Sequence, residues 1–440
     1  MRRLIISIIL TLLLTVWAKG LYFTGDGFDW KLFVIIITLS YMICYKLVQY
    51  LAQFKIVENN SRIDIVFVVC IIAFMFVPIL RIDRGQISVQ ENRTLAEYKP
   101  LIKDGLVNYS FGKDFENWFN DRFFGRKFFI DTNSAVNWFI NKKLKNQRAM
   151  AGKDNWLFTK RWNSVEMFQN KYLYSDDELQ EIKKNIEGLQ AWLAKRNTRF
   201  YIMLVPDKER VYGEFYPKGF EKVNKQAKIE QLYAFIRQHT TVPVIYVYDA
   251  LMEAKKQHIV YYKTGTHWNH RGAYAGYKAL FGRLKKDFPS LHIMTEDEFD
   301  IVPKLEADVD IASALDIDAY KIFPKEDMTY DVFRVKNPRA EGKHTYLEKE
   351  KKIETFDYMS SDPAKKLKAV FYADSMFLRM NWYVAESFKQ MQHIYVGYGR
   401  DYDLPFMGQD IRDIAPDIFV LETGERFLDR LLKIEVPEVE

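Results

Sequence analysis

Cysteine is almost absent from this sequence, with two residues in 440, Cys44 and Cys70. Such a count excludes a small fold held together by disulfide bonds. The glycine-rich loops G-x-G-x-x-G and G-x-x-x-x-G-K-[ST] are missing as well, so nothing supports a dinucleotide or P-loop nucleotide site. The H-E-x-x-H zinc motif, repeats and low-complexity stretches are also missing. We therefore expect neither a cofactor nor a metal.

The sequence also has little excess of one charge, since 64 basic and 58 acidic residues leave a net charge of +6. This excess is too small over 440 residues to indicate a nucleic-acid partner. It would suit a position beside anionic lipid or an anionic polymer. The apolar fraction of 48% and the aromatic fraction of 16% exclude a disordered chain.

Long apolar runs are confined to the first 85 residues. They are Leu4–Trp17, Leu32–Leu51 and Ile65–Leu80. A bilayer crossing needs about 20 mostly apolar residues, so residues 1–85 are expected to form a membrane anchor of three transmembrane helices. A cleaved signal peptide is the alternative for the first run.

Lys and Arg in the short loops favour one orientation of this anchor. The basic residues that flank the expected cytoplasmic ends are Arg2, Arg3, Lys46, Lys55 and Arg62. Three spans then place everything after Leu80 outside the cell, although Arg81 and Arg84 lie on the wrong side for a strict reading. Both cysteines fall inside expected spans, so the outer part has none, which suits an oxidising compartment.

Residues 86–150 form an aromatic-rich stretch that is expected to be helical and to lead into the outer domain. Its amphipathic segment starts at Asp114 and contains Phe115, Trp118 and Phe119. The segment is interpreted as a packing helix between domains. A helix that lies on the membrane surface or binds a partner is the alternative.

From Ser175 onward, short apolar strands alternate with helices. A capping box from Ser175 to Glu178 opens a helix with apolar residues at helical spacing through Leu193. Later helices are expected near 225–239 and 271–288. Strands are expected at 199–205, 244–248, 259–262, 369–372, 394–396 and 418–421, and residues 290–365 resemble an irregular, charged insertion. This order predicts an α/β domain with a parallel sheet covered on both faces, whose ligand site lies beyond the carboxyl ends of the strands.

Two of these strand ends carry residues suited to nucleophilic catalysis. Ser375 follows an apolar strand at an expected strand-to-helix turn, where backbone N–H groups can meet a developing oxyanion. His267 follows another strand and is expected at the same edge, where it can act as the base of that serine. The plainer alternatives are an N-cap serine and a structural histidine. His267 and His270 also form an H-x-x-H pair, but no carboxylate or cysteine stands beside them at ligand spacing.

Six short motifs in order resemble the SGNH-hydrolase-like proteins of the alginate O-acetyltransferase type, related to the DHHW proteins. The motifs are Glu91–Leu95, Phe115–Phe123 with Arg126, Gly152–Phe158, Val205–Lys208 with Tyr212 and Pro217, Thr266–Asn269 with Gly272 and Ala273, and Ala373–Ser375. The resemblance implies an SGNH-type three-layer α/β/α sandwich over residues 151–440, with the insertion at about 290–365. It also implies transfer of acyl groups, normally acetyl, to an exported polysaccharide.

The resemblance further implies a site and a setting. Ser375 would be the nucleophile and His267 its base. The candidates for supporting them are Asp374, Thr264, Thr266 and Asn269. Lys208 and Tyr212 are candidates for lining the acceptor site, and the alternative is that they are a surface charge and a core aromatic residue. A membrane-bound O-acyltransferase would be the protein partner. The chain would be a multi-pass protein of the bacterial cell membrane with an extracytoplasmic C-terminal domain.

One position departs from the family pattern. The aspartate expected two residues before the histidine is Gly265. Either another carboxylate, such as Asp207, Asp249 or Asp374, orients the imidazole instead, or Ser375 and His267 act as a dyad with Thr264, Thr266 or a carbonyl holding the ring. Three functions follow as alternatives: an O-acyltransferase, an extracytoplasmic carbohydrate esterase, and a weakly active or non-catalytic subunit that binds polysaccharide.

Overall fold

The computed structural model describes residues 87–88, 93–103, 106–136, 138, 148–315, 317–348, 353–396, 408–434 and 436. The three membrane spans expected within residues 1–85 lie outside this described part. No helix among the described residues combines the length and the apolar character needed to cross a bilayer. The chain divides into two compact units, residues 1–136 and 137–440.

The first unit contains two short hairpins and two helices. Strands β1 (Ile87–Ser88) and β2 (Arg93–Thr94) form one hairpin, and β3 (Ile102–Lys103) and β4 (Leu106–Val107) form the other. Helices α4 (Phe111–Arg122) and α5 (Arg126–Val136) follow. Phe111, Phe115, Phe119 and Phe123 stand four residues apart, and successive ring centroids lie 5.8, 6.1 and 5.9 Å apart, so they line one side of α4.

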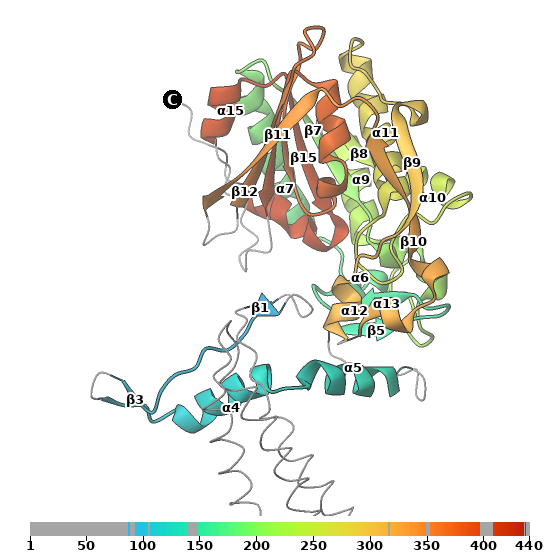
Figure 1. The fold of residues 1–440 in the computed structure, drawn as a ribbon. Coiled ribbons are helices and arrows are strands. Elements are labelled where there is room, and N and C mark those ends of the chain that lie inside the picture. The colour runs from blue at the N-terminus through green and yellow to red at the C-terminus, as the bar shows by residue number, and fades with distance from the viewer. Residues whose placement is uncertain are drawn as a thin grey trace, which may run out of the picture. The chain divides into compact units, whose positions relative to one another are not determined.

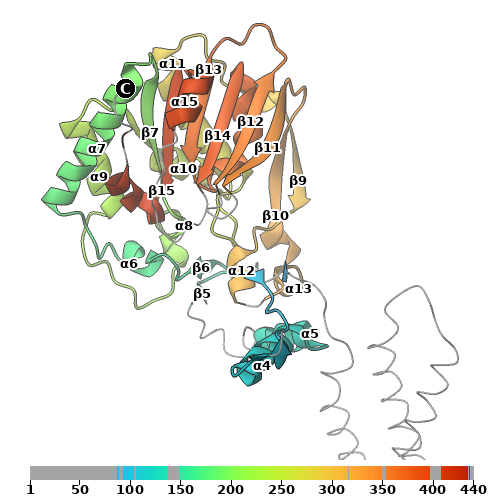
Figure 2. The ribbon, with the colours of Figure 1, turned by 90° about the vertical axis from the view of Figure 1, so that its left-hand side faces the viewer.

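A seven-stranded sheet forms the centre of the second unit, with strand order β11-β12-β14-β13-β15-β7-β8 (Figures 1 and 2). The parallel strands are β7 (Arg199–Val205), β8 (Val244–Tyr246), β13 (Lys368–Ala373), β14 (Gln390–Val396) and β15 (Ile418–Gly424). The antiparallel hairpin of β11 (Ala340–Glu348) and β12 (Ile353–Ser360) extends the edge beside β14. The sheet is therefore mostly parallel, as predicted.

Alternate residues of the central strands enter two separate cores. Phe200, Ile202 and Leu204 of β7 pack with helices α7 (Asp176–Ala194) and α9 (Lys228–His239). Tyr201 and Met203 pack on the other face with α10 (Tyr248–Lys255), α11 (His270–Asp287) and α14 (Asn381–Val384). Helices thus cover both faces of the sheet, since successive strand residues point to opposite sides (Figure 2).

Most predicted elements are confirmed, and two expectations are wrong. The capping box is present, with Ser175 accepting from the Glu178 N–H and starting α7. Residues 259–262 do not form a sheet strand but make only an isolated bridge between Tyr261 and Trp268. The segment 290–365 is not irregular, because it contains the antiparallel pair of strands β9 (Phe299–Leu305) and β10 (Thr329–Val335), as well as the β11–β12 hairpin of the main sheet.

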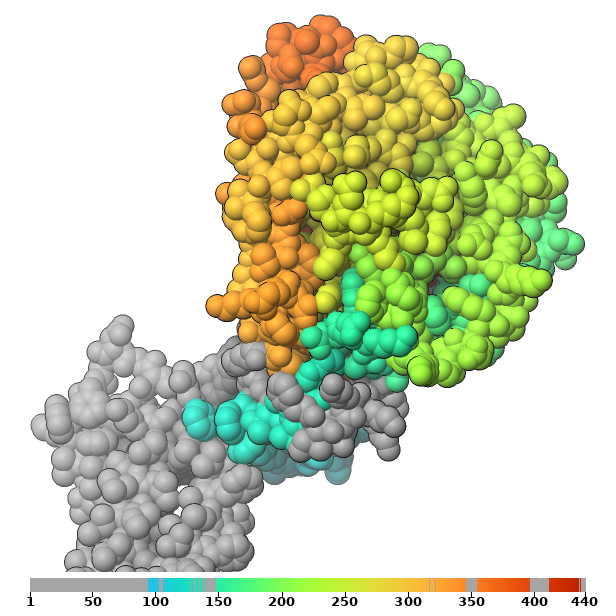
Figure 3. Space-filling view, turned by 90° about the vertical axis from the view of Figure 1, so that its right-hand side faces the viewer, coloured from blue at the N-terminus to red at the C-terminus, as the bar shows by residue number. Residues whose placement is uncertain are grey.

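The remaining elements lie around this sheet. They are β5 (Ala149–Ala151), β6 (Leu157–Thr159), α6 (Ser164–Phe168), α8 (Lys208–Val211), η3 (Gly213–Phe215), η4 (Glu296–Glu298), α12 (Asp310–Ala314), α13 (Ala319–Ile322), η5 (Lys325–Met328), η6 (Phe377–Arg379), η7 (Ala385–Ser387), α15 (Gly408–Ile414) and η8 (Glu425–Lys433). A small third core joins β5 and β6 to α12 and α13, with Leu157, Ile311, Leu315 and Phe323 buried in it. In the space-filling view, the yellow-to-orange strand pair β9–β10 lies beside the surface formed by α10 and α11 (Figure 3).

Candidate functional site

Ser375 and His267 meet beyond the carboxyl end of β13. The Oγ of Ser375 lies 2.8 Å from the Nε2 of His267, although 108 residues separate them in the sequence. The neighbouring residues tie the two loops together, because the indole Nε1 of Trp268 donates to the Met376 carbonyl at 2.8 Å. The sequence therefore placed both residues at the correct edge of the sheet.

Asp308 is the carboxylate that contacts the histidine. Its Oδ2 lies 2.5 Å from the Nδ1 of His267 and also accepts from the His267 backbone N–H at 3.2 Å. Ser375, His267 and Asp308 thus form the linear series of a nucleophile, a base and an orienting acid. Of the two alternatives, the contact supports another carboxylate and not a dyad, although this carboxylate is none of the three aspartates named from the sequence.

The three aspartates named from the sequence do not supply this carboxylate. Asp207 forms a buried ion pair with Arg426 at 2.8 Å, and Asp249 lies in the first turn of α10. Asp374 accepts from the Met376 N–H at 2.9 Å and the Gly424 N–H at 2.8 Å, so it holds the turn that carries Ser375. The signal for Asp308 in the sequence was weak. It lies in the stretch interpreted as an irregular insertion, 41 residues after His267.

Electrostatics favour an ionised Asp308 beside a basic imidazole. Burial alone lowers the pKa of His267, but the charge of Asp308 and their hydrogen bond outweigh it, so this pKa lies above its ordinary value. Burial raises the pKa of Asp308, yet the interactions with His267 dominate and hold it well below its ordinary value. The carboxylate therefore keeps a proton on Nδ1 and leaves Nε2 free to accept one from Ser375.

The supporting residues hold the loop of residues 262–269, which carries His267 and is called the histidine loop here. The Thr264 hydroxyl donates to the Asp308 carbonyl at 2.8 Å, and the Thr266 hydroxyl donates to Asp310 at 2.5 Å. Asn269 caps α11, since its side chain accepts from the Gly272 N–H at 3.1 Å. These contacts position the loop and do not reach the reacting atoms.

Lys208 and Tyr212 are both buried, so Tyr212 is the core aromatic residue of the alternative, whereas Lys208 is neither a surface charge nor exposed to an acceptor. Lys208 is fully buried, and its Nζ donates to the carbonyls of Tyr262 at 3.2 Å, Lys263 at 3.2 Å and Gly265 at 2.5 Å. The Tyr212 hydroxyl accepts from the Val260 N–H at 2.9 Å, and its ring stacks on Trp156 at 4.0 Å. Lys208 therefore holds the histidine loop itself, and Tyr212 holds the backbone just before it.

The turn after β13 also differs from expectation. It leads into the 3-10 turn η6 and not directly into an α-helix, and Ser375 makes no cap. Among the described residues, none accepts a hydrogen bond from the Ser375 N–H, which leaves this donor available for an oxyanion. The oxyanion donor expected from Ser375 itself is thus retained, without a helix behind it.

His267, Asp308 and Asp310 also satisfy a loose geometric test for a metal ion, since their ligand atoms lie within 4.8 Å of one another. Zinc binds its nitrogen and oxygen ligands at about 2.0–2.2 Å, which keeps adjacent ligand atoms roughly 3 Å apart. The 2.5 Å between Nδ1 of His267 and Oδ2 of Asp308 is too short for a shared ion and fits a hydrogen bond. Asp310 is also engaged by Thr266, so these residues do not fit a resident metal.

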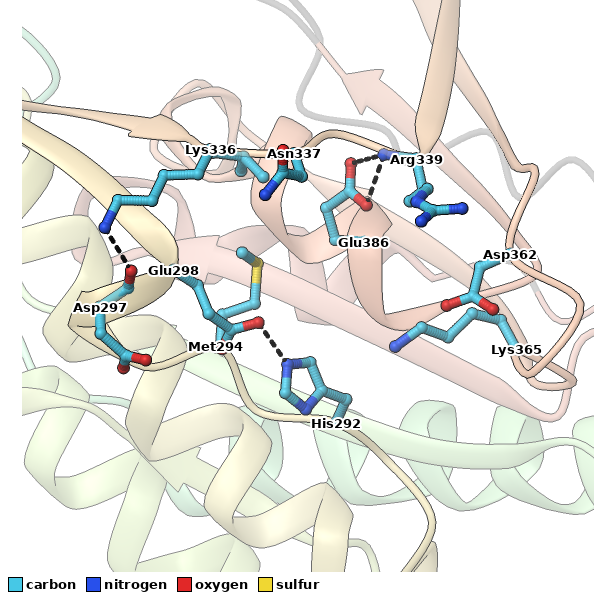
Figure 4. A pocket seen from close by; sticks show the side chains of 11 residues that line it. His292, Met294, Asp297, Glu298, Lys336, Asn337, Arg339, Asp362, Lys365 and Glu386 are labelled. Carbon is cyan, nitrogen blue, oxygen red and sulfur yellow. Dashed lines mark hydrogen bonds and ion pairs between the residues drawn. The ribbon is translucent and has the colours of Figure 1, made fainter.

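A polar cavity of about 390 Å³ lies elsewhere in the second unit (Figure 4). Its lining includes Asp362 and Lys365, which precede β13, and His292, which follows α11. Ser375 follows β13 and His267 precedes α11, so the cavity is at the opposite ends of these elements. It is not the binding site for a substrate of Ser375.

The sequence comparison agrees with the site. Residues 149–353 match the family model described as the SGNH hydrolase-like domain of the acetyltransferase AlgX. This segment is therefore similar to the SGNH hydrolase-like domain of that acetyltransferase. His267 and Asp308 lie within the matched residues, and Ser375 lies downstream of them. The family resemblance predicted from the motifs is confirmed.

The relatives and structures found to be similar share little sequence identity with this chain. The probable alginate O-acetylase AlgJ of Azotobacter vinelandii is 30% identical over 159 residues, which cover 33% of this chain and 39% of that protein. The structure is similar to Bacillus cereus PatB1 with a TM-score of 0.47 and 14% identity, and the match covers 65% of this chain and 99% of that one. It is also similar to a DHHW family protein from Eubacterium siraeum with a TM-score of 0.44 and 12% identity, and that match covers 63% of this chain and 91% of the other. At TM-scores this low, the two structural likenesses imply nothing about activity.

Proposed function

We propose that this protein is a membrane-anchored, extracytoplasmic O-acyltransferase that places acyl groups, normally acetyl, on an exported cell-surface polysaccharide. The observation that supports it most is the series Ser375–His267–Asp308, with contacts of 2.8 and 2.5 Å. The name of the similar protein from Azotobacter vinelandii, probable alginate O-acetylase, supports a polysaccharide as the acceptor. A membrane-bound O-acyltransferase is the proposed partner, because acyl groups must reach the outer face.

The reaction proceeds in two transfers. Ser375 Oγ attacks the carbonyl carbon of the acyl donor while His267 Nε2 takes its proton, and the Ser375 N–H stabilises the oxyanion. Collapse of the tetrahedral intermediate breaks the bond to the leaving group, which receives the proton from His267. A sugar hydroxyl then gives its proton to His267 and attacks the acyl-serine, and this proton returns to Ser375 as the ester is released.

The same geometry supports an esterase if water replaces the sugar hydroxyl. The non-catalytic alternative loses its main argument, because Gly265 does not leave the site without an acid. Whether water or sugar accepts the acyl group is decided by measuring products. We expect added polysaccharide to accelerate turnover and to carry acetyl groups detectable by mass spectrometry.

The nucleophile assignment is tested with the full-length chain in detergent. We expect turnover of 4-nitrophenyl acetate and a loss of about 10³-fold or more in Ser375→Ala, since the covalent step disappears. Mass spectrometry should detect an acetyl group on the peptide with Ser375. Ser361→Ala is the matched control, because Ser361 is an exposed serine that precedes β13, and it should keep the full rate. An unchanged rate in Ser375→Ala would exclude this proposal.

A further inference from the structure

Gly265 and Asp308 compete for the same space beside His267. A Cβ added to Gly265 would lie 2.2 Å from Cγ, 2.4 Å from Cβ and 2.4 Å from Oδ2 of Asp308. Real atoms do not approach so closely in a packed interior. A side chain at position 265 therefore requires the Asp308 side chain to leave its present place beside His267.

The segment with Asp308 is fixed to the histidine loop by bonds that do not involve the imidazole. Asp310 accepts from both the N–H of Thr266 at 2.8 Å and its hydroxyl at 2.5 Å. The N–H of Ala312 donates to the Thr264 carbonyl at 3.1 Å. The acid is thus brought to His267 by a firmly attached neighbouring segment, and the backbone near residue 308 stays in place without the Asp308 side chain.

An aspartate at position 265 can reach the point that the Asp308 oxygen now occupies. In any aspartate, a carboxylate oxygen lies about 2.4 Å from its own Cβ, as follows from standard bond lengths. The Cβ of residue 265 would lie 2.4 Å from the present Oδ2 of Asp308. The same oxygen position next to His267 Nδ1 is therefore accessible from either backbone.

We propose that residues 265 and 308 share one acid position, so that either can orient His267 provided that the other is glycine. The inference rests on the proposed function, because catalysis is its readout. Asp308 acts through His267 and is a positioning residue. What matters is the carboxylate next to Nδ1, and the segment that supplies it is exchangeable.

The test compares four full-length proteins: the unchanged chain, Asp308→Gly, Gly265→Asp, and the two substitutions together. Asp308→Gly should lose about 10²–10⁴-fold in kcat with aryl acetate, as expected for a lost orienting acid. Gly265→Asp alone should also lose activity, because its side chain collides with Asp308. The double variant should regain at least about 10-fold over Asp308→Gly, and its pH profile should return toward that of the unchanged chain.

The control is Gly265→Asn with Asp308→Gly, which has the same shape as the rescued variant without its charge. We expect no recovery in this control. The inference is overturned if the aspartate and asparagine double variants both recover. It is also overturned if neither recovers while Ser375→Ala and His267→Ala are inactive. If Ser375→Ala keeps its rate, the proposed function itself fails, so the two failures are distinguishable.

A second measurement does not depend on the fold of the double variant. Asp308→Gly leaves space for a small carboxylate, so added formate should restore part of its rate. Gly265→Ala with Asp308→Gly fills this space with a methyl group, so formate should not restore its rate. Absence of formate rescue in Asp308→Gly, or equal rescue in both proteins, contradicts a shared acid position.

Discussion

At the scale of single residues, the charge of Asp308 determines the pH range in which His267 can act as a base. Only the neutral imidazole accepts the proton of Ser375, and the Asp308 carboxylate holds the pKa of His267 above its ordinary value. The rate must therefore rise with pH through a midpoint above that of a free histidine, which is about 6.5. The carboxylate stays ionised throughout, because its own pKa is held low.

The first prediction concerns this pH dependence. In the unchanged chain, kcat/KM with aryl acetate should rise with a midpoint above about 6.5. Asp308→Asn removes the negative charge, so the midpoint should move to lower pH and the plateau should fall by about 10²–10⁴-fold. A profile from pH 5 to 9 measures both. An identical midpoint in the two proteins would show that Asp308 does not act on His267.

A second residue-scale prediction concerns Lys208, whose buried ammonium group is the donor for three carbonyls of the histidine loop. Lys208→Met leaves these carbonyls without their donor, which should lower the free energy of unfolding by about 2–4 kcal/mol and reduce kcat. Urea unfolding and aryl acetate turnover measure these effects. Lys184→Met is the control, because Lys184 is 76% exposed, and it should change stability by less than about 0.5 kcal/mol.

At the scale of elements, α12 and Leu315 after it anchor the segment that carries Asp308 and Asp310. Ile311 and Leu315 are buried in the small core with Leu157 and Phe323. Asp308 and Asp310 stand immediately before and at the start of α12, so packing of this helix decides where the carboxylates lie. A short helix of this kind has little stability alone and depends on its tertiary contacts.

This arrangement predicts that Ile311→Ala weakens catalysis from a distance. The cavity should lower the free energy of unfolding by about 2–4 kcal/mol and lower kcat by loosening the Asp308 contact. Leu305→Ala in β9 is the comparison, since Leu305 is 48% exposed and its truncation should affect neither quantity strongly. If Ile311→Ala loses stability and keeps full kcat, the packing of α12 does not control the position of the acid.

Elements and site were not equally predictable from the sequence. Periodicity and capping predict α7, β7 and β13 because their signals are local, and the rule for strand ends brings Ser375 and His267 together. The role of Asp308 was not predicted, because its segment contacts the histidine loop over a long distance in the sequence and leaves no periodic signal. Lys208 was misread because a buried lysine satisfied by carbonyls has the same sequence signature as a surface lysine.

At the scale of the whole molecule, the distribution of cysteine offers a direct test of the proposed topology. The sequence has no cysteine after Cys70, so a thiol introduced downstream reports on one known place. We expect Lys184→Cys in the full chain to react with a membrane-impermeant maleimide in intact cells or spheroplasts, because residue 184 is exposed on α7. The unchanged chain, with Cys44 and Cys70 only, is the control. Labelling that requires cell lysis would place the C-terminal domain in the cytoplasm and contradict the proposed location.

The collision between Gly265 and Asp308 also has an evolutionary consequence. A lineage that moves the acid from one position to the other cannot pass through a chain with aspartate at both, because the two side chains overlap. It must pass through glycine at both positions, a dyad ancestor with a reduced rate, unless both codons change together. A homologue with glycine at position 265 is therefore not a dead enzyme by that fact alone, and residue 308 has to be inspected before it is classed as one.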